Sequence, residues 1–144
     1  MAGNVDPIYT RIGDTSTNNA STGMPTHVIT ATGDYSGVSA NHVLIHTAGS
    51  NGSFVRGIRC TAEGTNTASV LRVYLNNGST NGTATNNALI GQVTLPATTA
   101  TNTAATVEIY YPLNLPIGAG FRVYVGVATT VAAGWMCVCD AGQY

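Results

Sequence analysis

The sequence predicts an all-β protein: a single eight-stranded jelly-roll-like β-sandwich with an extended N-terminal arm. Val, Ile, Thr and Tyr alternate with polar residues at the two-residue period of a half-buried strand. Clusters of Asn, Gly, Ser and Thr separate these runs, and no segment carries the longer apolar period of a helix. With 144 residues, the chain is long enough to bury one hydrophobic core.

The first part of the chain, residues 1–24, is predicted to be an extended N-terminal arm, and residues 25–144 to form the β-sandwich domain. The stretch "GDTSTNNASTGMP" is polar and of low complexity, so it has too little apolar area to offset the entropy lost on ordering. Before it, "VDPIYTRI" carries a few apolar side chains. We expect such an arm to become ordered by lying on another surface.

Turn signals divide the domain into its strands. Asn-Gly pairs and glycine clusters supply the positive φ that tight turns need. The stretch "NNGSTNGTATNN" at 76–87 predicts a long loop, and "PLNLPIGAG" at 112–120 predicts a turn. The predicted strands cover residues 26–32, 42–48, 54–61, 69–76, 88–95, 105–111, 121–128 and 134–140.

Three of these strands share one pattern: "LRVYL" at 71–75, "VEIYY" at 107–111 and "FRVYV" at 121–125. A period of two places their first, third and fifth residues toward the core, and the charged residue and the following tyrosine outside. A jelly roll conventionally orders its strands second-seventh-fourth-fifth and first-eighth-third-sixth. On that assumption the first and last of the three are antiparallel neighbours. The middle one lies in the opposite sheet, where Glu108 would meet Arg59.

This arrangement places Arg72, Tyr74, Arg122 and Tyr124 together on one outer surface. An Arg guanidinium over a Tyr ring stabilises an exposed site by about 0.5–1 kcal/mol. A solvated sheet face would also explain the pattern. Because Tyr and Arg are enriched in the cores of interfaces, and charges are few elsewhere, we favour a subunit interface.

The balance of charge restricts the partners. The chain has five basic and six acidic residues, and every basic residue is Arg. Without a basic cluster we expect no nucleic-acid binding, because that binding requires clustered Lys or Arg to displace counterions. Because so few charged residues leave little electrostatic repulsion between copies, we expect assembly into a homo-oligomer. No apolar run has membrane-spanning length and the N-terminus has no apolar signal region, so we expect synthesis in a cytoplasm and no membrane contact.

The cysteines are expected to be buried, reduced thiols. Cys60, Cys137 and Cys139 are odd in number and lie inside strand-like segments, which does not suit a disulfide framework. In "WMCVC" the alternation places Trp135, Cys137 and Cys139 on one face. A redox pair is an alternative, but Cys-x-Cys on a strand holds its sulfurs poorly for a bridge, so core residues are favoured.

The histidines do not predict a metal site. His42 and His46 would share one face of a strand but lie about 13 Å apart, too far to bind one ion. His27 would have to fold in beside one of them, and no Cys/His set has metal-ligand spacing. We therefore expect surface or interface histidines, and neither a metal nor another cofactor.

No catalytic set is evident either. The carboxylates that could act in hydrolysis, Asp34, Glu63, Glu108 and Asp140, are scattered, and no Gly-x-Ser-x-Gly elbow is present. We expect the protein not to be an enzyme. Glycan binding by the Asn-rich 76–87 loop and nearby aromatics is an alternative, although an exposed connection between two strands explains that loop as well.

The middle and C-terminal segments resemble a family of known proteins. The stretches "FVRGIRCTAEGTNTASVLRVYLNNG", "ALIGQVTLPATTA" and "PLNLPIGAGFRVYVGVATTVAAGW", within residues 54–140, are similar to small β-rich structural proteins of tailed bacteriophages and prophages. The motifs are strand-and-turn patterns and carry no catalytic residue. The resemblance implies a jelly-roll or related β-sandwich virion component, often trimeric, on a capsid or in a tail.

The function that follows from this resemblance is a capsid cement or decoration protein, which bridges capsid subunits and stabilises the shell. It would form a homotrimer on the capsid surface of the virion, assembled in the host cytoplasm, with the major capsid protein as its partner. In the arm, Pro7, Ile8, Tyr9 and Arg11 are predicted to dock onto the shell. The alternative is a tail-fibre or spike module that binds a host-surface glycan. An enzyme of unknown class is a third hypothesis.

Overall fold

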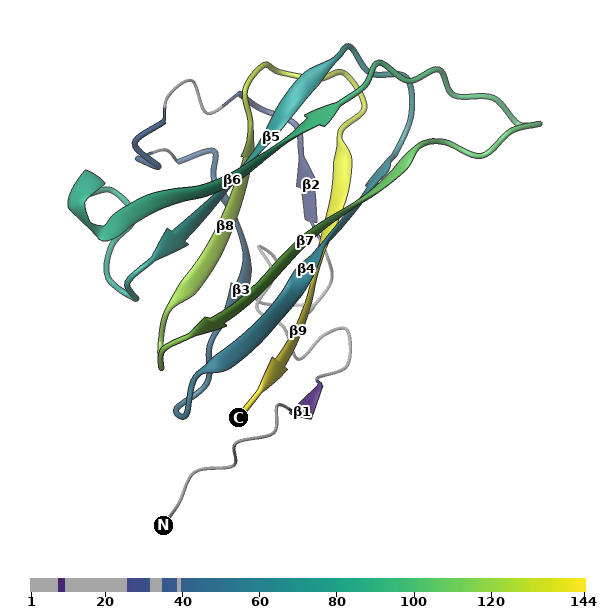
Figure 1. Cartoon of the computed structure of the whole chain (residues 1–144). Helices are drawn as coiled ribbons and strands as arrows, with labels where there is room; N and C mark the ends of the chain where they lie inside the picture. Colours follow the sequence, from purple (N-terminus) through teal and green to yellow (C-terminus); the bar gives the residue numbers. More distant parts are fainter. Residues whose placement is uncertain (1–7, 10–25, 32–34, 39) are drawn as a thin grey trace.

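The predicted β-sandwich is confirmed by the computed structural model, which describes residues 8–9, 26–31, 35–38 and 40–144. Two antiparallel sheets pack face to face (Figure 1). Among the described residues the one helical element is a 3₁₀ turn, η1 (Ala84–Asn86), and no helix is long or apolar enough to cross a membrane. The strands are β1 (Ile8–Tyr9), β2 (Thr26–Val28), β3 (Val43–Thr47), β4 (Ser53–Ala62), β5 (Ser69–Asn76), β6 (Asn87–Leu95), β7 (Glu108–Ile117), β8 (Arg122–Val127) and β9 (Trp135–Gln143).

The strand order assumed from the sequence is also confirmed. One sheet has the order β3-β8-β5-β6, and the other has the order β1-β9-β4-β7. The short strand β2 pairs with β9 as well, at its Trp135 end, whereas β1 pairs at its Gln143 end. Beyond β2 the chain crosses to the other sheet, where Ala31 forms a parallel bridge with Val127. The predicted first strand, 26–32, is therefore shorter than expected.

The predicted turn at 112–120 is wrong in its first half. β7 continues through Ile117, although it contains Pro112 and Pro116. Proline is tolerated here because β7 is the last strand of its sheet, so one side of its backbone has no strand to pair with. The turn itself is confined to the residues around Gly118–Phe121, whose backbone groups are hydrogen-bonded to each other.

A bulge in β4 sets which of its side chains enter the core. Relative to β9, the step from Val55 to Gly57 corresponds to a single residue, from Ala141 to Asp140, so Arg56 is an extra, outward residue. Relative to β7 the register shifts at the same place in the opposite sense, and there β7 has the additional residue. As a result Val55 and Ile58 both point inward and are fully buried, although they are three residues apart. Without the bulge, Ile58 would face solvent.

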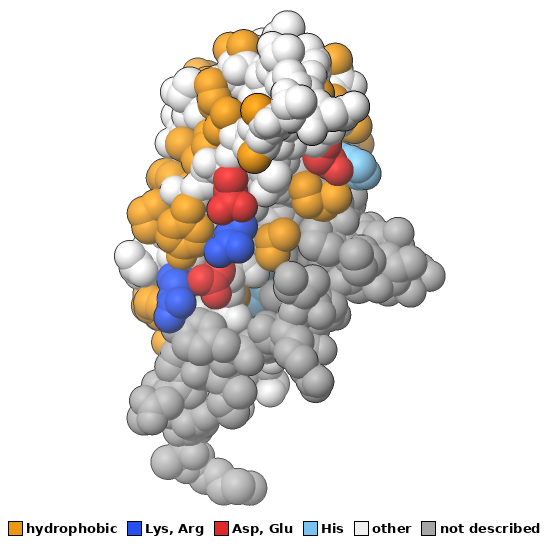
Figure 2. Space-filling view, turned by 90° about the vertical axis from the view of Figure 1, so that its right-hand side faces the viewer, with side chains coloured by type: hydrophobic (Ala, Val, Ile, Leu, Met, Phe, Trp, Pro, Cys, Tyr) orange, Lys and Arg blue, Asp and Glu red, His pale blue; other side chains and the backbone are white. Residues whose placement is uncertain are grey.

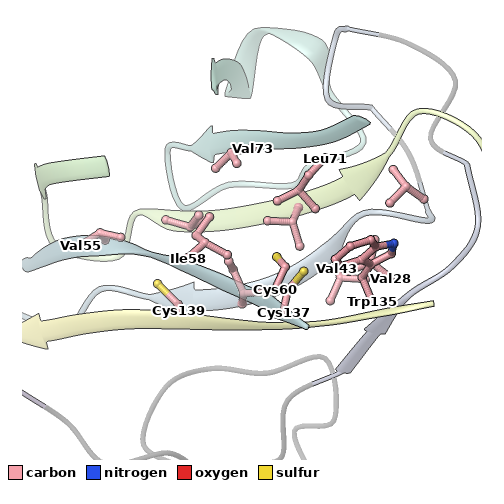
Figure 3. Close-up of a cluster of buried hydrophobic side chains, with 14 of the residues drawn as sticks. Val28, Val43, Val55, Ile58, Cys60, Leu71, Val73, Trp135, Cys137 and Cys139 are labelled. Atoms are coloured by element: carbon pink, nitrogen blue, oxygen red, sulfur yellow. The ribbon is translucent and has the colours of Figure 1, made fainter. Parts of the chain in front are cut away.

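The core lies between the sheets and is built largely of β-branched residues around one tryptophan (Figure 3). The predicted inward phasing is confirmed at Leu71 and Val73 of β5 and at Val123 and Val125 of β8, all of them fully buried. Each such side chain stabilises the fold by about 1.5–3 kcal/mol relative to its exposed state. Trp135, also fully buried, fills the end of the core nearest β2.

Candidate functional site

The face predicted to be a subunit interface is covered by the chain itself. β5 and β8 are antiparallel neighbours, and Tyr74 lies directly opposite Tyr124, as predicted. However, Arg72 is only 7% exposed and Tyr74 is 0% exposed. Tyr74 therefore has no surface left for a partner and Arg72 has little, which counts against the prediction that these two residues contact another subunit.

The segment that covers this face includes Tyr35, Gly37 and His42. The ring of Tyr35 lies 4.2 Å from the guanidinium carbon of Arg72, so Arg72 stacks on a tyrosine other than the expected Tyr74 and Tyr124. The ring centroids of His42 and Tyr74 are 4.4 Å apart. Nδ1 of His42 donates a hydrogen bond to the carbonyl of Gly37 at 2.7 Å, which holds the segment closed over the strand.

The other two residues of the predicted interface are half-buried. Nη1 of Arg122 donates to the carbonyl of Ser79 at 3.3 Å, so this guanidinium supports the loop after β5. Tyr124 lies in the row of outward side chains between Leu44 and Tyr74. Their contact with a second subunit stays a prediction.

The Asn-rich 76–87 loop is hydrogen-bonded to itself. Asn76 and Asn77 donate their side-chain amides to Asn87 and Asn86, at 2.9 and 3.2 Å. Asn86 and Asn87 in turn donate to backbone carbonyls inside the loop, including that of Asn81. These amides are the groups that a glycan would need, and they already serve to hold the loop together.

The predicted docking arm is described only in part. Ile8 and Tyr9 form β1, and they pair with Gln143 and Gly142 near the end of β9. Pro7 and Arg11 lie outside the described residues. The pairing places this part of the arm at the outer edge of the five-stranded sheet (Figure 1).

Two of the carboxylates considered for catalysis, Glu108 and Asp140, lie beside arginines. Arg59 and Glu108 approach to 3.7 Å, which confirms the predicted pair, and Arg56 and Asp140 also approach to 3.7 Å. Figure 2 shows acidic and basic side chains gathered in one column on this face, with hydrophobic side chains beside it. These exposed pairs contribute little to stability. Asp34 lies outside the described residues.

The prediction that His42 and His46 share one strand face is wrong. The register between β3 and β8 shifts between Leu44 and His46, so a bulge reverses the alternation. His46 consequently lies opposite the inward Val123 and is fully buried, whereas His42 points outward to Tyr74. In the described part of the chain, no three His, Cys, Asp or Glu side chains form a group that could hold a metal ion.

The third histidine borders a small surface pocket. His27 contacts the carboxylate of Glu63, which joins β2 to the loop after β4. The adjoining pocket has a volume of about 250 Å³, and its lining is His27, Ile29, Thr30, Ala40, Asn41 and Val43. His27 is the one titratable side chain among these residues, so the lining supplies no acid–base pair.

The cysteines are buried core residues, as predicted, and two of them are cross-strand partners. Cys60 of β4 lies directly opposite Cys137 of β9. Burial and a hydrogen bond with Cys60 raise the pKa of the Cys137 thiol, and burial followed by the charge of Asp140 raises the pKa of Cys139 to about 12. The thiols of Cys137 and Cys139 therefore stay protonated and unreactive at neutral pH.

The sequence reasoning missed the edge of the sandwich between β6 and β7, here called the β6–β7 edge. Each of these strands is the last of its sheet, and Tyr111 of β7 reaches across to Gly91 of β6. Six apolar side chains pack against the core along this edge but are only partly buried: Ile90, Val93, Ile109, Tyr111, Leu113 and Leu115. A signal was present in the sequence, since "IYYPLNLPI" continues the alternation through both prolines.

Comparison of the chain with protein-family models, with curated proteins and with solved structures gives no match.

Proposed function

We propose that the protein is a structural component of a tailed-bacteriophage virion, a jelly-roll capsid cement or decoration protein that bridges capsid subunits. It acts as a homo-oligomer, and its partner on the shell is the major capsid protein. The stabilisation comes from contact area and not from chemistry. The strand-and-turn resemblance within residues 54–140 motivates the proposal.

The observation that carries the proposal is that polar side chains of the described residues contact the rest of the chain, while apolar side chains at one edge remain partly exposed. The histidine, arginine and asparagine groups that could bind a small ligand instead contact other parts of the chain, as at His42, Arg122 and Asn87. At the same time the β6–β7 edge leaves core-packed apolar side chains partly in water. A chain built in this way is suited to contacts with large surfaces.

In this proposal the N-terminal arm binds the shell. β1 lies at the edge of the sheet, so Ile8 and Tyr9 are at a place that a neighbouring protein can reach. Pro7, Ile8, Tyr9 and Arg11 supply the apolar and cationic contacts, and the ordering entropy of the arm is offset on docking.

The direct test is an image of the virion at a resolution that identifies this fold. Copies arranged on the capsid lattice would support the proposal. Copies confined to the tail would contradict it and favour the alternative of a host-recognition module.

A second test removes the arm. Deletion of residues 2–24 is expected to abolish binding to purified capsids while the domain remains folded, as checked by circular dichroism. The matched control is a variant in which the exposed residues Ser79 and Thr85 are replaced by Ala, because it alters a different surface segment. Capsid binding that survives the arm deletion would contradict arm docking.

A further inference from the structure

The β6–β7 edge carries apolar side chains that remain partly exposed to water. Its six apolar side chains face the core, yet none is fully buried, because within the described ranges no strand follows β6 or β7 to close the sandwich. The corresponding inward residues one strand further in, such as Leu71, Val73 and Ile58, are 0% exposed. The edge therefore resembles a core that has been left open on one side.

This edge is protected against the addition of another strand. In β7, Pro112 and Pro116 lack the backbone N–H that a pairing strand would use, and Asn114 adopts a positive φ of 48°. In β6, the register with β5 shifts next to Tyr74, which is the mark of a bulge. An extended peptide that binds by strand pairing does not fit this edge, so its occupant must present side chains.

The charge of the edge selects the class of occupant. From Val73 to Val107, and again from Ile109 to Phe121, the sequence has no formally charged residue. The residue between these stretches, Glu108, begins β7 and lies 3.7 Å from Arg59. A partner with charged residues at the contact would lose their hydration and gain no ion pair. A surface that is equally free of charge matches, and a second copy of this chain supplies one.

The loop between β6 and β7, which crosses from one sheet to the other, extends the same surface. It projects well beyond the sandwich (Figure 1), and residues 99–105 are all exposed. Only its base is attached, through the backbone pair of Asn66 with Thr98 and the bond from Ala100 N–H to Thr65 Oγ1. The tip consists of uncharged Thr, Ala and Asn residues, so it cannot bury a core of its own.

We propose that a second copy of the chain covers the β6–β7 edge, with the tip of the β6–β7 loop of one subunit lying against its neighbour. This inference rests on the proposed role in assembly and names the surface of the subunit contact. It replaces the outer face of Arg72 and Tyr74, which the chain itself covers. The partly buried apolar side chains of the edge would then form the centre of the interface, with the loop at its rim.

The experiment measures molar mass by light scattering after size-exclusion chromatography. The wild type is expected to be an oligomer at about 100 µM, and Val93→Asp to weaken its association at least about tenfold. Thr94→Asp is the matched control: it adds the same charge at the neighbouring, exposed position of β6 and should leave the mass unchanged. A folded Val93→Asp variant with the wild-type mass would overturn the inference.

A second measurement avoids the risk that Val93→Asp fails to fold. Hydrogen exchange of the wild type is followed at high and low protein concentration. Backbone amides of β6 and β7 should lose protection on dilution, whereas those of β3, the opposite edge of its sheet, should not. Equal protection at both concentrations, or a monomeric wild type, would overturn the inference. Neither result would decide the virion proposal, which the capsid-binding assay tests separately. A protein that forms the oligomer but does not bind capsids would contradict only the virion proposal.

Discussion

At the scale of single residues, His46 is the clearest conflict between a side chain and its surroundings. It is 0% exposed, and neither ring nitrogen has a hydrogen-bond partner among the described residues. Burial lowers the pKa of His46 from 6.5 to about 4, so the ring is neutral in the folded protein near pH 7. The unfolded chain binds this proton near pH 6.5, whereas the folded chain resists it until about pH 4.

The resulting contribution to stability is therefore present above pH 6.5 and is lost as the pH falls toward 4. The lost free energy of unfolding amounts to about 3 kcal/mol. His46→Leu removes the titrating group and should flatten this part of the pH dependence. Urea unfolding of both proteins at pH 7 and at pH 4.5 measures the difference. An unchanged pH dependence in the variant would show that His46 is not the group responsible.

At the scale of elements, β7 shows how an edge strand accommodates two consecutive tyrosines. Tyr110 lies outside, over Gly57 of β4, where an added Cβ would lie 2.6 Å from its ring. Tyr111 lies inside, and its ring and hydroxyl occupy the position that a side chain at Gly91 of β6 would take. Each tyrosine thus depends on a glycine in another strand, once within the sheet and once across the sandwich.

Gly91→Ala should consequently destabilise the protein, because the new methyl group would displace the Tyr111 ring. We expect a loss of about 1–3 kcal/mol in the free energy of unfolding. Gly82→Ala is the control, since its nearest atom outside the adjacent residues is Thr80 Oγ1 at 3.5 Å. In a Tyr111→Ala background the cost of Gly91→Ala should largely vanish. Similar costs in both backgrounds would rule out this steric explanation.

At the scale of the whole molecule, one asparagine holds together three loops that connect different pairs of strands. Asn66, in the loop from β4 to β5, accepts hydrogen bonds from the N–H groups of Ala133 and Gly134 at 2.8 and 2.9 Å. Its own amide donates to the carbonyl of Gly134 at 3.1 Å, and its backbone pairs with Thr98. The loop from β4 to β5 and the turn from β8 to β9 both connect one sheet to the other, so Asn66 fastens the two sheets at that end.

Asn66→Ala would leave the N–H groups of Ala133 and Gly134 without this acceptor. We expect the free energy of unfolding to fall by about 2–4 kcal/mol, as measured by urea titration. Asn102→Ala, at an exposed position of the projecting loop between β6 and β7, should change it by less than about 0.5 kcal/mol. An equally small effect at both positions would contradict the proposed role of Asn66.

The strand pattern could be predicted because alternation depends on local backbone geometry. "LRVYL" and "FRVYV" place their inward residues as expected, and the pair of Arg59 with Glu108 follows from the strand order. The candidate site was less predictable. Nothing in the local pattern around Arg72 indicates that residues near Tyr35, far away in the sequence, would cover it.

The sequence by itself determined an all-β sandwich, most of its strands and the inward residues of its central strands, because a period of two and turn residues act over a few positions. Only the tertiary structure decided that Tyr74 meets its own chain and that His46 turns inward. The partial exposure of the β6–β7 edge is also visible only in the tertiary structure. These outcomes depend on bulges, on crossing loops and on which strands end a sheet, and contacts between distant segments set all of them.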